Sequence, residues 1–293
     1  KIRAMSIIRE LEPHPRGAYC GTIGWWEPGG RAEFNVAIRT VTVDTEIGMA
    51  RYPVGGGITY GSSPDAEYAE CLDKAAVLTQ PAPDFELLET LRYDADGVFL
   101  REGHLDRLAA SAEYFGFPFD RAAAAAALDT AVQPLAAGRS GPPAAFKIRL
   151  RLDRNGAIHI DSEPLRALPS PLRVGLAPHP VEAGDVRLFH KTTARTLYEA
   201  ARAARPDCDD VLLWNTRGDI TESTMANLVI ERDGRKTTPP LEAGLLGGVF
   251  RRRLLENGAI REGPIRRADL AGGRSIYLVN SVRRWMEARW VDG

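Results

Sequence analysis

The residues best suited to chemistry in this sequence are Lys191 and Glu222, the second of which lies in the run ITESTMANL at 220–228. A lysine amine forms an imine with an aldehyde, and a carboxylate keeps a pyridine nitrogen protonated, so that the ring can accept electrons. Few other lysines compete for this role, because the remaining ones are Lys1, Lys74, Lys147 and Lys236. The pair therefore indicates an anchor for a cofactor that carries both an aldehyde and a pyridine ring.

A phosphorylated cofactor also needs an anion site, and the sequence offers one. Gly247 and Gly248 precede the apolar run 249–255. Glycines let the backbone approach an anion, and a helix N-terminus adds N–H donors and a favourable dipole. Arg107 supplies a planar, permanent positive charge. Beside a cationic, desolvated cofactor the pKa of Lys191 should be lowered, so that its free amine can act as a base.

Each of these residues has an ordinary interpretation when it is taken alone. Lys191 would be a surface lysine at a helix start, Arg107 an exposed helix arginine, and Glu222 a turn carboxylate. The glycine pair would be a turn before a helix. Their shared order and spacing favour the cofactor site.

The composition limits the other functions that the chain can have. A net charge of −1 over 293 residues gives no reason to expect nucleic acid or an anionic membrane as a partner. Cys20, Cys71 and Cys208 are odd in number and lack CxxC pairing, which suits reduced thiols in the cytoplasm. No apolar run is long enough to span a bilayer. The short arginine runs 251–253 and 283–284 are expected on solvated faces.

The elements that must position these residues fall into two regions, 1–80 and 85–293, joined by a proline-containing linker at 81–84. The periodicity predicts an α+β pattern without internal repeats. In the first region we expect helices at 2–11 and 64–78 and a hairpin of 19–26 with 33–43. In the second region we expect helices at 105–115, 121–133, 193–204 and 248–257, a hairpin of 85–92 with 98–101, and strands at 145–152, 157–162, 172–177, 210–215, 226–231 and 275–280.

Residues 85–293 resemble the class IV aminotransferases, which are pyridoxal-phosphate enzymes of fold type IV. The similarity rests on five segments in the family's order: 85–92, 104–108, 190–191, 221–227 and 246–251. The resemblance implies that Lys191 binds the cofactor aldehyde, that Arg107 holds its phosphate and that Glu222 pairs with its pyridine nitrogen. It also implies cofactor contacts from Asn227, Gly248, Val249 and Phe250, although a threonine often stands where this chain has Phe250.

The family includes D-amino-acid and branched-chain transaminases and the lyase that makes 4-aminobenzoate. Arg195 resembles the lyase version and is implied to bind substrate, whereas the branched-chain enzymes keep a tyrosine where this chain has Thr196. We therefore expect an aminodeoxychorismate lyase. A transaminase of D- or branched-chain amino acids and a non-catalytic fragment remain the alternatives.

Residues 1–80 resemble the C-terminal part of the chorismate-utilising enzymes, through segments 1–5, 16–21, 37–40, 55–58 and 67–70. The resemblance implies that Tyr19 and Arg39 contact chorismate carboxylates, with backbone N–H groups from Gly55, Gly56 and Gly57. It also implies that Glu67 and Glu70 bind Mg²⁺, and their i, i+3 spacing places both on one side of a helix. The family's other catalytic residues lie upstream of Lys1, so we expect no chorismate activity from this region alone.

Together the two resemblances suggest a fusion of aminodeoxychorismate synthase component I with the lyase, which would serve folate-precursor synthesis. Lys191 would remove the proton from the carbon that bears the amine, enolpyruvate would leave from the adjacent carbon, and the ring would become aromatic. The resemblance further implies a homodimer, and for a full-length parent a glutamine amidotransferase that supplies ammonia.

Overall fold

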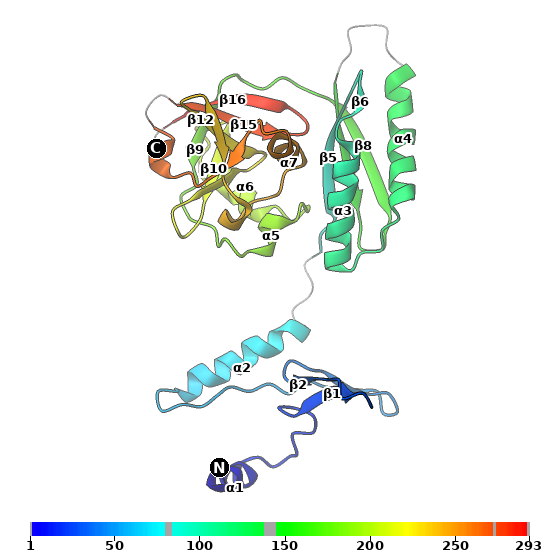
Figure 1. The fold of residues 1–293 in the computed structure, drawn as a ribbon, viewed down its shortest axis with the longest axis vertical. Helices are drawn as coiled ribbons and strands as arrows, with labels where there is room; N and C mark the ends of the chain where they lie inside the picture. Colours follow the sequence, from blue (N-terminus) through cyan, green and yellow to red (C-terminus); the bar gives the residue numbers. More distant parts are fainter. Residues whose placement is uncertain (1, 80–83, 138–144, 272–273, 292–293) are drawn as a thin grey trace. The chain divides into compact units, whose positions relative to one another are not determined.

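The chain divides into two units, residues 1–82 and 83–293, and each is described by itself. The computed structural model describes residues 2–79, 84–137, 145–271 and 274–291 (Figure 1). The predicted linker at 81–84 lies, apart from Asp84, outside these ranges.

The first unit contains two helices and two short hairpins. The helices are α1 (Ile2–Leu11) and α2 (Pro64–Thr79), and the hairpins are β1 (Thr22–Trp26) with β2 (Ala32–Val36) and β3 (Thr42–Asp44) with β4 (Met49–Arg51). Both predicted helices and the first hairpin are confirmed, but the strand expected at 33–43 ends at Val36. Ala37 is the one buried hydrophobic residue in the described part of this unit, and Trp26 is 76% exposed. This unit therefore has almost no hydrophobic core of its own.

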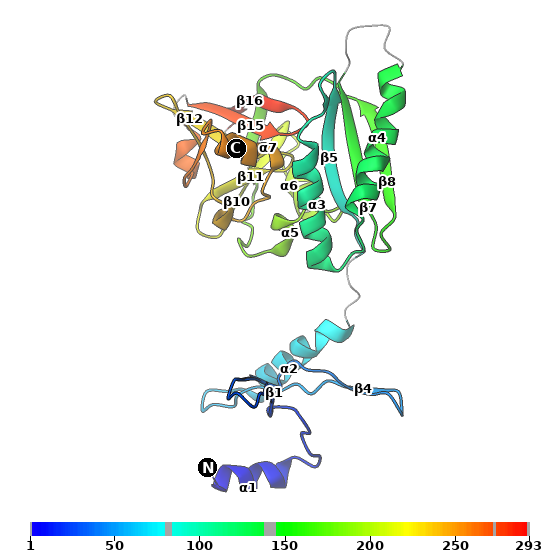
Figure 2. The same cartoon turned by 45° about the vertical axis from the view of Figure 1, so that its right-hand side comes forward.

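The second unit begins with a four-stranded sheet of order β6-β5-β7-β8. Its elements are β5 (Leu87–Asp94), β6 (Gly97–Val98), α3 (Arg101–Phe115), α4 (Arg121–Ala137), β7 (Phe146–Leu152) and β8 (Ile158–Pro164). The two helices cover one face of the sheet (Figures 1 and 2). The strand expected at 98–101 was wrong beyond Val98, because Leu100 turns the chain at a φ of 52° and α3 starts at Arg101.

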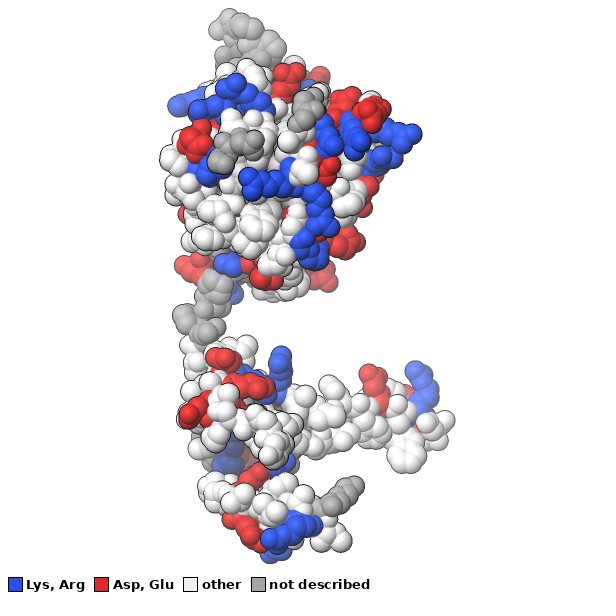
Figure 3. Space-filling model, turned by 90° about the vertical axis from the view of Figure 1, so that its left-hand side faces the viewer, with Lys and Arg blue, Asp and Glu red and all other residues white. Residues whose placement is uncertain are grey.

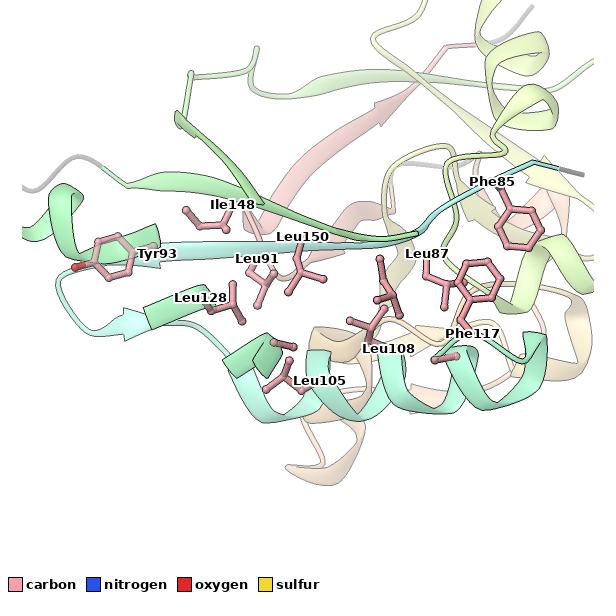
Figure 4. Packing of buried hydrophobic residues seen from close by; sticks show 13 residues of the cluster. Phe85, Leu87, Leu91, Tyr93, Leu105, Leu108, Phe117, Leu128, Ile148 and Leu150 are labelled. Atoms are coloured by element: carbon pink, nitrogen blue, oxygen red, sulfur yellow. The ribbon is translucent and has the colours of Figure 1, made fainter. Parts of the chain in front are cut away.

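The core of this layer lies between β5, β7 and the two helices (Figure 4). Leu87 and Leu91 lie on the same face of β5, toward α3, because strand side chains repeat with a period of two. They meet Leu105 and Leu108, which lie about one helical turn apart. Glu89 occupies the position between Leu87 and Leu91 on the same face, and it too is buried.

A mixed eight-stranded sheet, of order β11-β10-β9-β16-β15-β12-β13-β14, forms the rest of the unit. Its strands are β9 (Leu172–Leu176), β10 (Asp210–Trp214), β11 (Ile220–Ser223), β12 (Asn227–Arg232), β13 (Arg235–Thr238), β14 (Arg261–Glu262), β15 (Ser275–Asn280) and β16 (Arg284–Trp290). Its helices are α5 (Val186–Phe189), α6 (Thr196–Ala203) and α7 (Val249–Glu256). The predicted strands β9, β10, β12 and β15 are confirmed, whereas β11, β13, β14 and β16 were not predicted.

The expectation that the arginine run 251–253 lies on a solvated face was wrong for Arg251, which is 3% exposed. Its guanidinium donates to the Pro239 carbonyl at 2.7 Å and to Glu262 at 2.6 Å. These partners satisfy a charge that burial would otherwise make costly.

The surface shown in Figure 3 carries basic and acidic side chains interspersed with uncharged ones. Within the described ranges, no helix has the length and apolar character needed to cross a membrane.

Candidate active site

A cavity of about 470 Å³ in the second unit is lined by residues from both sheets. The residues that the sequence singled out meet there: its lining includes Arg107, Lys191, Arg195, Glu222, Asn227, Gly248 and Val249. Leu88 and Thr90 of β5 contribute the wall on the side of the four-stranded sheet. The folding of the unit thus brings together segments that are far apart in the sequence.

Lys191 lies between α5 and α6, in a segment attached to the edge of the first sheet. Its carbonyl accepts a hydrogen bond from the Leu88 N–H at 2.9 Å, and Thr192 forms a β-bridge with Leu87. The surrounding protein desolvates the amine and, with the nearby positive charges of Arg195 and Arg107, lowers the pKa of Lys191 to about 7. A neutral amine is therefore accessible near neutral pH, which both imine formation and proton removal require.

Glu222 lies on β11 and is 4% exposed. The Tyr198 hydroxyl donates to its Oε1 at 2.9 Å, and the Asn227 amide lies 3.5 Å from its Oε2. Burial raises the pKa of Glu222 to about 7, against the stabilising effect of these donors and of Lys191. A cation brought next to this carboxylate would favour its ionised form.

Arg107 projects from α3 and is held by Glu89. Its Nε and Nη2 donate to the two carboxylate oxygens at 2.8 and 2.6 Å, and its Nη1 donates to the Gly247 carbonyl at 3.2 Å. Glu89 also lies 2.6 Å from Nδ1 of His104. Burial by itself would raise the pKa of Glu89, but the charges of Arg107 and His104 hold it at about 2.

Sequence reasoning missed the roles of Glu89 and His104. The available signal was Glu89 itself, a carboxylate at a position of β5 where the alternation of apolar residues predicts burial. An unpaired charge is rarely buried, so a residue of this kind is expected to have a charged partner. His104 is 2% exposed and belongs to the cavity lining, and its buried Nε2 has no hydrogen-bond partner in the described part of the chain.

The start of α7 provides backbone donors at the cavity. Gly248 is the N-cap, and no side chain caps the helix. A Cβ at Gly248 would lie 2.0 Å from Oδ1 of Asn227, so only glycine lets the two segments approach this closely. Asn227 in turn donates to the Leu246 carbonyl at 2.8 Å and fixes the turn. The free N–H groups at this helix start suit a phosphate.

Phe250 does not lie in the cavity. Its side chain is buried with Val229, Leu254 and Val279, and it meets the Phe99 ring edge-to-face at 5.6 Å. Because the helix turns this side chain toward the core, only the backbone of Phe250 could contact a cofactor, and the expected contact stays a prediction. Its backbone N–H still belongs to the first turn of α7.

Arg195 lines the cavity but already has protein partners. Its guanidinium lies over the Tyr198 ring at 4.3 Å and donates to the Thr224 carbonyl at 2.5 Å. The lining also contains Lys147, Arg149 and Arg283, which sequence reasoning missed, along with polar side chains that include Asn280 and the acidic Glu199. The cavity therefore has a basic character that suits an anionic substrate.

Four of the residues expected to bind chorismate or metal lie together in the first unit. A Cβ on Gly55 would lie 2.7 Å from the Tyr19 hydroxyl, and one on Gly56 would lie 2.5 Å from Oε2 of Glu67. Gly57 follows them in the chain and has open space around it.

The remaining predicted residues of this unit are placed differently. Arg39 is exposed at a φ of 52° after β2, and Glu70 is engaged by Lys74 at 2.5 Å. Oε1 of Glu67 accepts from Ser62 at 2.6 Å. Among the residues that the structure describes, no group of three acidic, histidine or cysteine side chains could hold a metal ion. The Mg²⁺ site therefore stays a prediction for a longer protein.

A lysine amine with a lowered pKa, a buried carboxylate, an arginine and an uncapped helix start surround one cavity. These groups match the aldehyde, pyridine nitrogen and phosphate of pyridoxal phosphate, and the uncapped N–H groups at the start of α7 suit the phosphate. The site and the two-sheet fold fit the class of pyridoxal-phosphate enzymes.

Comparison with known proteins defines the family. Residues 86–290 match the amino-transferase class IV family, and residues 1–80 match the chorismate binding enzymes. The chain belongs to the class IV aminotransferases. A Schizosaccharomyces pombe protein described as a candidate aminodeoxychorismate lyase is 32% identical over 209 residues, which cover 68% of this chain and 86% of that protein.

A solved structure of a Mesorhizobium loti protein, described as a candidate amino-acid aminotransferase, aligns with a TM-score of 0.64 and 34% identity, and covers 71% of this chain and all of that one. The N-terminal region is 43% identical to aminodeoxychorismate synthase component 1 of Salmonella typhimurium over 81 residues, or 28% of this chain and 17% of that protein. It is equally similar to anthranilate synthase component 1 of Cereibacter sphaeroides, over 29% of this chain and 16% of that protein.

Proposed function

We propose that the second unit is an aminodeoxychorismate lyase, which converts 4-amino-4-deoxychorismate to 4-aminobenzoate and pyruvate with pyridoxal phosphate. The observation that carries the proposal is the position of Lys191 and Glu222 in one cavity, together with the pKa of about 7 for the lysine amine. Two similarities support this substrate over others: the Schizosaccharomyces pombe relative, and the match of residues 1–80 to the chorismate binding enzymes.

Each residue of the cavity has a role that follows from its position. Pyridoxal phosphate, when bound, withdraws electrons from the carbon that carries the substrate amine. Arg107 and the first N–H groups of α7 would hold the phosphate, and Glu222 would hold the pyridine nitrogen. Lys191, as a neutral amine, removes the proton from the amine-bearing carbon. The bond from the adjacent ring carbon to the enolpyruvyl oxygen then breaks, enolpyruvate leaves and takes up a proton as pyruvate, and the ring becomes aromatic.

The basic lining of the cavity supports a substrate with two carboxylates. Lys147, Arg149 and Arg283 lie on its wall. Such cations would strengthen the binding of a dianion.

The test is a pyruvate-release assay with enzymatically made aminodeoxychorismate and no keto-acid co-substrate. Pyruvate released in step with 4-aminobenzoate is the expected result. A transaminase is the second candidate, which the likeness to the Mesorhizobium loti protein favours. It would consume amine only when a keto acid is added, and that outcome would replace the lyase assignment. A chain that binds no pyridoxal phosphate would be the non-catalytic alternative.

For a longer form of the protein we propose a bifunctional enzyme that also makes aminodeoxychorismate, in a pathway to folate. Mg²⁺ at Glu67 and Glu70, ammonia from a glutamine amidotransferase and homodimerisation belong to this proposal. The clustering of Tyr19 and Glu67 with two glycines supports it, and the three free cysteines suit a reducing cytoplasm. Chorismate turnover by the longer form with Mg²⁺ and ammonia would test the first activity, and sedimentation equilibrium would test the dimer.

A further inference from the structure

Tyr198 is a cavity residue that none of the recognised motifs includes. It lies in the first turn of α6, is 8% exposed, and packs its ring among Leu188, Val211 and Leu213. The packing leaves the hydroxyl directed at Glu222, to which it donates at 2.9 Å. Packing in the core therefore fixes the position of the Tyr198 hydroxyl.

Arg195 strengthens this arrangement by stacking on the ring. Its guanidinium lies 4.3 Å from the ring centroid, and its Nη2 is anchored on the Thr224 carbonyl two residues beyond Glu222. A cation on an aromatic face is attracted to the ring's electrons, and its charge also makes the phenol O–H a better donor. The stack thus joins α6 to the turn that follows Glu222.

Glu222 has few other partners. Burial raises its pKa to about 7, and the Tyr198 hydrogen bond is the largest of the effects that lower it. The charged and polar groups that face the carboxylate from the packed elements are Tyr198 of α6, Asn227 of β12, the backbone N–H of Leu246, and Lys191 and Arg195 of the loop between α5 and α6. Removal of the hydroxyl would therefore leave Oε1 without its side-chain donor.

We propose that Tyr198 is a positioning residue, which keeps Glu222 ionised and aimed at the pyridine nitrogen of the cofactor. A hydrogen bond to the charged form of an acid favours that form. An ionised Glu222 in turn keeps the pyridine nitrogen protonated. The proposal rests on the proposed function, because it assigns Glu222 to that nitrogen.

The experiment compares the whole chain with its Tyr198→Phe variant in binding pyridoxamine 5′-phosphate between pH 5.5 and 9. This probe has no aldehyde, so the titration of Lys191 as an imine-forming group does not enter the measurement. Affinity should fall as the pH drops through the pKa of Glu222, since a neutral acid cannot pair with a pyridinium. Without the hydroxyl the pKa is higher, so the fall should begin about one pH unit higher, which is roughly a tenfold loss of affinity at a fixed pH below the midpoint.

Two controls separate positioning from a general structural effect. Tyr277 is half-buried, donates to Glu231 at 3.4 Å and lies outside the cavity lining, so Tyr277→Phe should bind like the wild type. An analogue with carbon in place of the ring nitrogen should show no difference between the wild type and Tyr198→Phe. An equal loss of affinity at every pH, or an equal loss for the carbon analogue, would overturn the proposal.

A direct titration keeps the proposal testable if the cofactor assignment fails. In that case the wild type would bind neither pyridoxamine phosphate nor pyridoxal phosphate, and the proposed function would be wrong. The ¹³C signal of the Glu222 carboxyl in the free protein, assigned with Glu222→Gln, should still titrate at a higher pH in Tyr198→Phe. An unchanged midpoint would show that the hydroxyl does not support the carboxylate.

Discussion

The Arg107 guanidinium donates from Nε and Nη2 to the two oxygens of the buried Glu89 carboxylate, at 2.8 and 2.6 Å. Paired hydrogen bonds of this kind fix the plane of the guanidinium as well as its position. The charge proposed to bind phosphate is therefore oriented by a carboxylate that belongs to the core of the first sheet.

Glu89→Gln should weaken cofactor binding. The amide can accept only one of the two hydrogen bonds and carries no charge, so Arg107 loses its fixed orientation. We expect the affinity for pyridoxal phosphate to fall about tenfold or more, measured by fluorescence titration. Glu86→Gln is the matched control, because Glu86 pairs with Arg151 away from the cavity lining. Equal affinity in Glu89→Gln and the wild type would contradict the orienting role.

The same carboxylate should make the second unit sensitive to acid. The pKa of Glu89 is about 2 in the folded chain against an ordinary 4.5, because Arg107 and His104 outweigh its burial. Its contribution to stability is therefore complete above pH 4.5 and is lost as the pH falls toward 2. Urea unfolding at pH 5 and pH 3 should show a smaller loss of stability for Glu89→Gln than for the wild type. Parallel losses would show that other groups control acid unfolding.

Gly248→Ala should be costly, whereas Gly247→Ala should be tolerated. A Cβ at 248 would lie 2.0 Å from Oδ1 of Asn227, but a Cβ at 247 would meet only the flexible end of Leu241 at 3.6 Å. We expect the first variant to lose about 2 kcal/mol of unfolding free energy, along with much of its cofactor affinity. Denaturant unfolding and cofactor titration of both variants provide the measurement. Similar values for the two alanines would argue against a close approach at Gly248.

Lys191→Ala should abolish both the visible absorption of bound pyridoxal phosphate and the release of pyruvate, by a factor of about a thousand or more. Lys236→Ala is the control, since Lys236 pairs with Glu231 on β12. Retained turnover in Lys191→Ala would exclude this residue as the anchor.

Borohydride trapping of pyridoxal phosphate on the wild-type protein should become faster as the pH rises through about 7. The pKa of Lys191 is lowered to about 7, mainly by burial, so the neutral amine predominates above that pH. Mass spectrometry of the Lys191 peptide at a series of pH values measures the trapped fraction. A midpoint near the ordinary lysine pKa of 10.5 would show that the amine is not desolvated.

The pattern of apolar residues predicted the elements that have strong local signals. The helices α1 and α3 follow from a period of 3.6, the strands β7, β9 and β15 follow from a period of two, and the alanine-rich helix α4 follows from high helix propensity. The strand β11 is only four residues long and β16 carries charged and polar residues among its apolar ones, so their local patterns were weak. Partner strands in the large sheet, rather than local pattern, make these segments extended.

The sequence by itself predicted which residues could hold the cofactor, because lysine is scarce in this chain and because Lys191, Glu222, Arg107 and Gly248 stand in the order and spacing of the family that it resembles. Tertiary structure decided which groups support them: Glu89 behind Arg107, and Tyr198 behind Glu222. It also placed the Phe250 side chain in the core and buried Arg251. The physical reason is that hydrogen bonding, burial and charge between distant segments depend on how the two sheets and their helices pack, and no local pattern of residues specifies that packing.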